Sequence, residues 1–79
     1  MRGAAAAMTV ESANAVLTEI FGADSRAFVE AVYLKNNILG IKTSGSGATL
    51  EIRMREGDII AKINEKFGGP AVNKIKFLS

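Results

Sequence analysis

The 79-residue sequence contains neither cysteine nor histidine. Without cysteine, disulfide bonds and thiolate metal sites are excluded, which favours a reducing compartment such as the cytoplasm. Without histidine, the usual general base of a nucleophilic pair and the commonest nitrogen ligand of zinc are missing. Tryptophan is also absent, and tyrosine occurs once. The composition therefore offers no catalytic constellation, metal site or cofactor site.

Long hydrophobic runs, internal repeats and low-complexity linkers are absent as well. The chain has no candidate transmembrane segment, and its length allows one domain. Residues 1–8, MRGAAAAM, are too short an apolar stretch for a signal peptide, so we expect a disordered leader or a cloning remnant there. A single domain is expected over residues 9–79.

Charge is distributed unevenly between the two halves of the sequence. Residues 1–34 carry a net charge of −2, whereas residues 35–79 carry +4. A basic second half favours a polyanionic partner. The alternative is a solvated surface that keeps the domain soluble.

Residues 9–21 are predicted to form the first helix. Thr9 is a candidate N-cap, and Gly22 ends the pattern. A turn or a short helix is expected to follow over residues 23–28. The apolar side chains of the helix form one stripe: Val10, Ala13, Leu17, Ile20 and Phe21.

Residues 58–67 give the strongest helical pattern, with Asp58 as the expected N-cap and Gly68 as the stop. A helix of about three turns is marginal alone in water, so its apolar stripe needs a sheet to lie on. The stripe consists of Ile59, Ile60, Ile63 and Phe67.

Three segments are predicted to be strands: residues 29–35, 38–43 and 72–78. Asn36-Asn37 is a two-residue hairpin signal, because asparagine tolerates positive φ. In the first strand, alternation predicts Val32 and Leu34 on one face and Ala31, Tyr33 and Lys35 on the other. In the second strand, Ile38 and Ile41, or else Leu39, are expected to point inward, depending on register. In the third strand, Ile75 and Phe77 are expected to point inward, with Lys74 and Lys76 opposite.

Residues 48–55 are ambiguous. Leu50, Ile52 and Met54 alternate with charged residues, which is the period of a strand. The local pattern alone therefore favours a further strand over a helix. Gly57 breaks this pattern before the helix at 58–67.

The ordered segments together resemble the DciA family of small bacterial proteins. The resemblance is carried by IFG (20–22), VYLKNNIL (32–39), EIRMREGDIIAKINEKFG (51–68) and VNKIKFL (72–78). These segments are similar to the family's glycine-ended first helix, its hairpin, its helical segment and its closing Lys/Arg-x-Ile-Arg/Lys-Phe strand. The sequence departs from the family at Leu17 and Ala48, where tryptophan is frequent, and at Asn37, which replaces the hairpin glycine.

The resemblance implies an α+β, KH-like fold: a three-stranded sheet with helices packed on one face, in the order α-β-β-α-α-β. It also implies that residues 48–55 are helical. We follow the resemblance on this point, because a helix there leaves the last strand free to join the hairpin. Ile52 and Met54 would then pack at the junction between two helices.

The function that the resemblance implies is binding and not catalysis. DciA-like proteins act on the bacterial replicative helicase and help to place it on single-stranded DNA. The sequence agrees with a protein that is not an ATPase, because it has no phosphate-binding Gly-x-x-x-x-Gly-Lys-Ser/Thr loop. Two alternatives remain: an RNA-binding or ribosome-associated KH-like module, and a structural domain that homodimerises through a sheet edge.

The expected nucleic-acid contacts are basic side chains, because phosphates require only cations on one face. Tyr33 is expected on the same strand face as Lys35, where it could stack on a base. No Gly-x-x-Gly loop for gripping a nucleic-acid backbone is present, so the usual KH reading mode is not expected. The candidate residues are Lys35, Lys42, Arg53, Arg55, Lys62, Lys66, Lys74, Lys76 and Tyr33.

Overall fold

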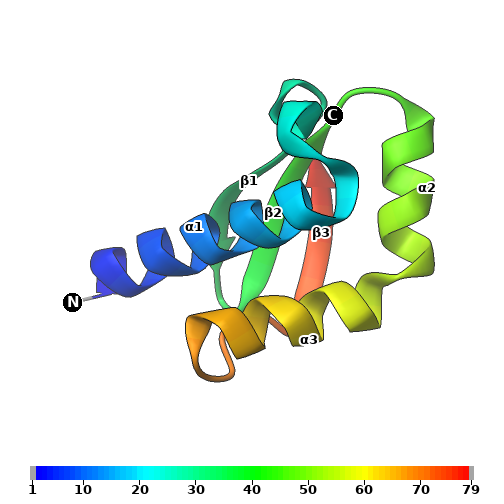
Figure 1. The fold of residues 1–79 in the computed structure, drawn as a ribbon. Coiled ribbons are helices and arrows are strands. Elements are labelled where there is room, and N and C mark those ends of the chain that lie inside the picture. Colours follow the sequence, from blue (N-terminus) through cyan, green and yellow to red (C-terminus); the bar gives the residue numbers. More distant parts are fainter. Residues whose placement is uncertain (1, 79) are drawn as a thin grey trace.

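The structure, a computed structural model, describes residues 2–78 and folds them in the predicted order α-β-β-α-α-β (Figure 1). Within these residues there is no helix with the length and apolar character that a bilayer crossing requires. The elements are α1 (Arg2–Phe21), the 3₁₀-helix η1 (Ala23–Ala27), β1 (Val29–Lys35), β2 (Ile38–Thr43), α2 (Ser46–Met54), α3 (Glu56–Phe67) and β3 (Lys74–Leu78).

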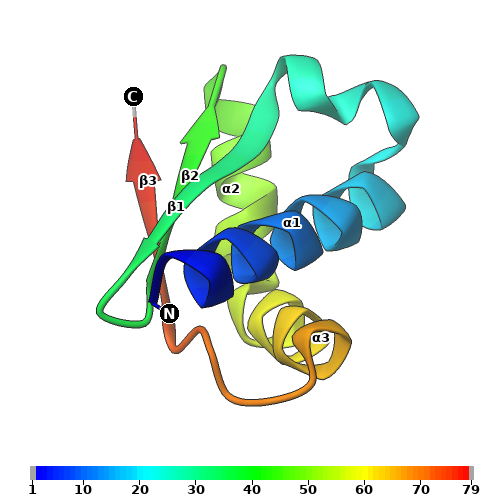
Figure 2. The ribbon, with the colours of Figure 1, turned by 90° about the vertical axis from the view of Figure 1, so that its left-hand side faces the viewer.

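The three strands form one mixed sheet in the order β1-β2-β3. β1 and β2 are antiparallel, and β3 runs parallel to β2. Figure 2 shows the helices on one side of this sheet and open space on the other. The α+β prediction with helices on one face is therefore confirmed. The core between the layers contains Ala13, Leu17, Val29, Leu39, Ile41, Ile52, Ile59, Ile63 and Ile75.

The first helix begins seven residues before its predicted start, at Arg2 instead of Thr9. Thr9 is buried within the helix, and its hydroxyl donates a hydrogen bond to the Ala5 carbonyl over 2.9 Å. The predicted Thr9 cap is therefore wrong, and residues 2–8 are helical where the sequence suggested disorder. Gly22 ends the helix with φ 105°, as predicted.

The local strand pattern at residues 48–55 is wrong, and the helix implied by the resemblance is confirmed as α2. The alternation misled because its apolar residues do not share one buried face. Ile52 is fully buried, whereas Leu50 is 58% and Met54 is 72% exposed. The expected packing at the helix junction therefore holds for Ile52 and fails for Met54.

Helix α3 begins at Glu56, two residues before the predicted Asp58, and its N-cap is Arg55. Ile59 and Ile63 are buried in the core, as predicted, and Gly68 ends the helix in the left-handed conformation. Helix α3 is not the helix that lies directly across the sheet. α1 crosses the sheet directly, and α3 lies beside α1 (Figures 1 and 2).

Strand β1 carries a β-bulge between Ala31 and Tyr33. Ala31 pairs with Ile41, and Tyr33 pairs with the preceding residue, Gly40, so Val32 is the extra residue. A bulge of this kind shifts the side-chain alternation by one position. Leu34 therefore packs on the core, as does Ala31, while Val32 is 48% exposed. The predicted pairing of Val32 with Leu34 on one face is wrong for this reason.

The side chains of Asn37 and Asn64 hold the segment that precedes the last strand. Asn36 and Asn37 adopt φ 53° and 64°, which confirms the predicted hairpin turn, and the Asn37 side chain donates to the Ala71 carbonyl over 2.9 Å. From α3, the Asn64 side chain accepts hydrogen bonds from the Ala71 and Val72 amides and donates to the Val72 carbonyl. The segment after α3 is thus tied to both the hairpin and the helix, which delays the start of β3 from the predicted residue 72 to Lys74.

Candidate nucleic-acid interface

The helix-free side of the sheet, called here the outer face, is organised in three rows by strand register. Residues at matched positions on neighbouring strands point to the same side. Because Leu39, Ile41 and Ile75 are buried against the helices, their neighbours along the strands point outward. The rows, from β1 to β3, are Lys35–Ile38–Lys74, Tyr33–Gly40–Lys76 and Glu30–Lys42–Leu78.

Four lysines are therefore gathered on the outer face, and all four are exposed. Two of them, Lys74 and Lys76, project from the same side of β3, as the sequence predicted. The carboxylate on this face, Glu30, accepts a hydrogen bond from Arg26 at 3.2 Å. Its charge is thereby partly balanced by a cation outside the rows. The outer face thus carries positive charge that faces solvent directly.

Tyr33 lies in the middle row, on the same strand face as Lys35, which confirms the predicted placement. Its ring lies over Gly40, where a Cβ atom would meet the Tyr33 ring carbons. The glycine therefore leaves room for the ring over the central strand, in the same row as Lys76. An aromatic ring at such a position can stack on a base while lysines hold the flanking phosphates.

The other four predicted residues lie in the helical layer, away from the outer face. Arg55 forms an ion pair with Glu51 at 3.0 Å, and Lys66 forms one with Glu19 at 2.9 Å. Lys62 is exposed on α3. Sequence spacing could not separate these cations from the sheet lysines, because the separation follows from strand register.

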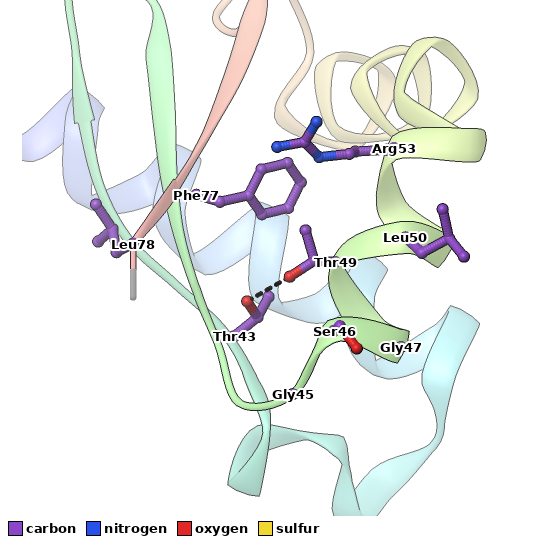
Figure 3. Close-up of a pocket in the computed structure, with 9 residues that line it drawn as sticks. All are labelled: Thr43, Gly45, Ser46, Gly47, Thr49, Leu50, Arg53, Phe77 and Leu78. Atoms are coloured by element: carbon purple, nitrogen blue, oxygen red, sulfur yellow. Dashed lines mark hydrogen bonds between the residues drawn. The ribbon is translucent and has the colours of Figure 1, made fainter.

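Arg53, the last of the predicted cations, lies at a second feature, the groove between α2 and β3. Its guanidinium carbon is 5.3 Å from the centre of the Phe77 ring. This groove has a volume of about 710 Å³ and is lined mainly by apolar atoms. The hydroxyls of Thr43 and Thr49, which belong to its lining, lie 2.7 Å apart and join β2 to α2 (Figure 3). We call it the edge groove.

The acidic side chains of the described residues were the remaining candidates for a metal site. Among residues 2–78, no three acidic side chains come together in a way that would hold a metal ion. The carboxylates of Glu56 and Asp58, which flank Gly57, lie in the first turn of α3, where acidic residues complement the helix dipole.

Sequence reasoning missed Asn14, Asn64 and Glu56, whose side chains hold the sheet in place. Asn14 is buried in α1 and bonds both to the Ala31 amide and to the Ala31 carbonyl, over 2.8 and 3.0 Å. The available signal in the sequence was a polar residue at helical spacing within an otherwise apolar stripe.

Comparison with known proteins assigns the chain to a family. The family model described as "Dna[CI] antecedent, DciA" matches residues 1–77, which is nearly the whole sequence. A comparison with curated protein sequences gives no match. The family match agrees with the resemblance carried by the helix ends, the hairpin and the closing strand. The chain belongs to the DciA family.

Proposed function

We propose that this protein is a non-enzymatic, cytoplasmic binding module that contacts the replicative helicase and holds single-stranded DNA on the outer face of its sheet. The family match supports a helicase-loader-like role in DNA replication. The single observation that carries the DNA-binding part is the gathering of Lys35, Lys42, Lys74 and Lys76 around Tyr33 on a helix-free surface.

The mechanism follows from the chemistry of this surface. Lysines contact phosphates as mobile point charges and select no sequence. The strand registers spread the four lysines over all three strands, so a single strand of DNA crossing the sheet meets several of them. Tyr33 supplies a flat ring for a base between these contacts. Binding of this kind suits a protein that must hold DNA of any sequence.

Salt dependence gives the first test. For single strands, the logarithm of the binding constant falls with the logarithm of salt by about 0.7 for each neutralised phosphate, so four lysines predict a slope of about −3. The double variant Lys74→Glu/Lys76→Glu should bind fluorescent oligothymidylate at least about tenfold more weakly and show a slope no steeper than about −1.5.

The matched control changes the same number of charges in the helical layer. Lys62→Glu/Lys66→Glu should keep the affinity and the slope of the unmodified protein, since neither residue lies on the outer face. Equal losses in the two double variants would show that only net charge matters and would refute the proposed surface. Preference for an oligouridylate over the matched oligothymidylate would favour the RNA-binding alternative.

The helicase contact has a separate test. Immobilised protein should capture purified replicative helicase in the presence of nuclease, which removes bridging DNA. The Lys74→Glu/Lys76→Glu variant tests whether helicase and DNA bind to the same surface. If this variant still captures the helicase but no longer binds DNA, the two partners contact different surfaces. Absence of capture by the unmodified protein would contradict the helicase part of the proposal.

A further inference from the structure

The two edge strands of the sheet, β1 and β3, differ in whether their outward-facing backbone groups are free to pair with another strand. At the β1 edge, the Asn14 side chain is hydrogen-bonded to both the amide and the carbonyl of Ala31, and the neighbouring bulge interrupts the strand. Such devices prevent a further strand from pairing with an edge. The β3 edge lies beside the edge groove, and no strand within residues 2–78 pairs with it.

One amide of the β3 edge is already occupied. The Ile75 amide donates to a carboxylate oxygen of Glu56 over 3.3 Å, which shows that the backbone N–H of Ile75 points away from β2. Backbone groups alternate along a strand, so the amide and the carbonyl of Phe77 point to the same free edge. Pairing with an added strand is therefore open at Phe77, at the mouth of the edge groove.

The side chains around this position set the chemistry of an occupant. The groove is lined by the half-buried Phe77 ring on β3 and by Leu50 on α2, which is 58% exposed (Figure 3). Arg53 lies over the ring and makes no ion pair with a side chain of residues 2–78. On the outer side of the same strand, Lys74 and Lys76 are exposed.

An added strand would present its own side chains alternately to these two sides. Those entering the edge groove meet Phe77 and Leu50 and should be aliphatic. Those on the outer side lie next to Lys76 and should be acidic. We propose that the edge groove binds an extended peptide segment of a partner protein, in which aliphatic and acidic residues alternate, by adding it as a fourth strand at Phe77.

Two other occupants fit the surface less well. A second copy of this chain, paired β3 to β3, would bring the Lys74 and Lys76 rows of the two copies together, and like charges on adjacent strands repel. A nucleic-acid strand would find Arg53 as the one cation among the residues that line the edge groove, all of which lie within residues 2–78. The lysines that suit phosphates lie on the outer face instead.

The probe for this site is a capped heptapeptide, Val-Glu-Val-Glu-Val-Glu-Val, added to the isotope-labelled full chain and followed by NMR. We expect the Phe77 amide signal to shift and its hydrogen exchange to slow at least about tenfold at saturation. A peptide of the same composition in blocks, Val-Val-Val-Val-Glu-Glu-Glu, and one with lysine in place of glutamate should each bind at least about tenfold more weakly.

Two single substitutions on α2 give a matched pair of variants. Leu50→Asp places a carboxylate in the edge groove and should weaken heptapeptide binding at least tenfold. Met54→Asp adds the same charge to the same helix at a side chain that is 72% exposed and does not line the groove, so it should change the affinity less than twofold. Both side chains are exposed, so the fold is retained in either variant.

Three results would overturn the proposal. The first is absence of heptapeptide binding at millimolar concentration, and the second is unchanged affinity in Leu50→Asp. The third is an oligothymidylate that shifts the Leu50 and Phe77 signals and binds more weakly to Leu50→Asp, which would make the groove a nucleic-acid site. The proposed peptide site shares Lys76 with the proposed DNA surface, but neither substitution on α2 touches the outer face, so loss of heptapeptide binding in Leu50→Asp can be told apart from loss of DNA binding.

Discussion

Gly40 shows how a single missing side chain shapes the outer face. It lies on the central strand, opposite Tyr33, and the tyrosine ring occupies the space that a Cβ atom would need. Glycine within a strand is destabilising, because it loses more backbone entropy on folding and has no side chain to pack. Here the packing of the Tyr33 ring over Gly40 offsets this cost.

A double-mutant cycle tests this contact. Gly40→Ala should lower the free energy of unfolding by about 1–3 kcal/mol, because the Tyr33 ring must move away. In a Tyr33→Ala background the same change should be neutral or stabilising by up to about 1 kcal/mol, since alanine is the better strand residue. Urea denaturation of the four proteins measures both values. Equal costs in the two backgrounds would mean that the ring does not depend on Gly40.

At the scale of elements, α1 does more than cover the sheet, because its Asn14 side chain serves as the hydrogen-bonding partner of the β1 edge. The bulge beside Ala31 disrupts the regular ladder locally, and the buried amide of Asn14 supplies a donor and an acceptor at the same place. The helix therefore provides hydrogen-bond partners for backbone groups of the irregular strand.

Asn14→Ala should lower the free energy of unfolding by about 2–4 kcal/mol, because it leaves the amide and the carbonyl of Ala31 buried without partners. The increase in helix propensity from asparagine to alanine offsets only about 0.5 kcal/mol of this. Asn73→Ala is the control, since Asn73 is exposed and its hydrogen bond to the Asn37 carbonyl is made by the backbone amide, which the substitution keeps. Thermal and urea denaturation that gave the same small loss in both variants would contradict the role of Asn14.

At the scale of the whole molecule, the two layers differ in how their charges are used. In the helical layer, Arg55 and Lys66 are paired with carboxylates of the same layer. The four lysines of the outer face make no ion pair within residues 2–78. Exposed pairs contribute little to stability, so we expect this difference between the layers to have little effect on the fold.

Ligand-linked stability follows from this division. An oligothymidylate at one hundred times its dissociation constant should raise the free energy of unfolding by about 2.7 kcal/mol, which is on the order of 10 °C in melting temperature for a domain of this size. The Lys74→Glu/Lys76→Glu variant should melt within a few degrees of the unmodified protein without DNA and should gain almost nothing at the same DNA concentration. A variant that melts much lower without DNA would show that these lysines support the fold itself.

Several features of this protein were predictable from neighbouring residues alone. The isoleucine spacing of α3, the glycines that end α1 and α3, and the asparagine pair of the hairpin each act within a few positions of the chain. These features could be read from short stretches of sequence, since the hydrogen bonds of a helix or a tight turn join residues only two to four positions apart.

Only the tertiary structure decided the rest. Residues 48–54 are helical, which buries Ile52 and leaves Leu50 and Met54 exposed, whereas the local alternation pointed to a strand. The gathering of four lysines on one face depends on the bulge in β1 and on the parallel register that joins β2 to β3 across some 36 residues. Register over such distances is set by packing and by contacts such as those of Asn14 and Asn64, which no short window of sequence contains.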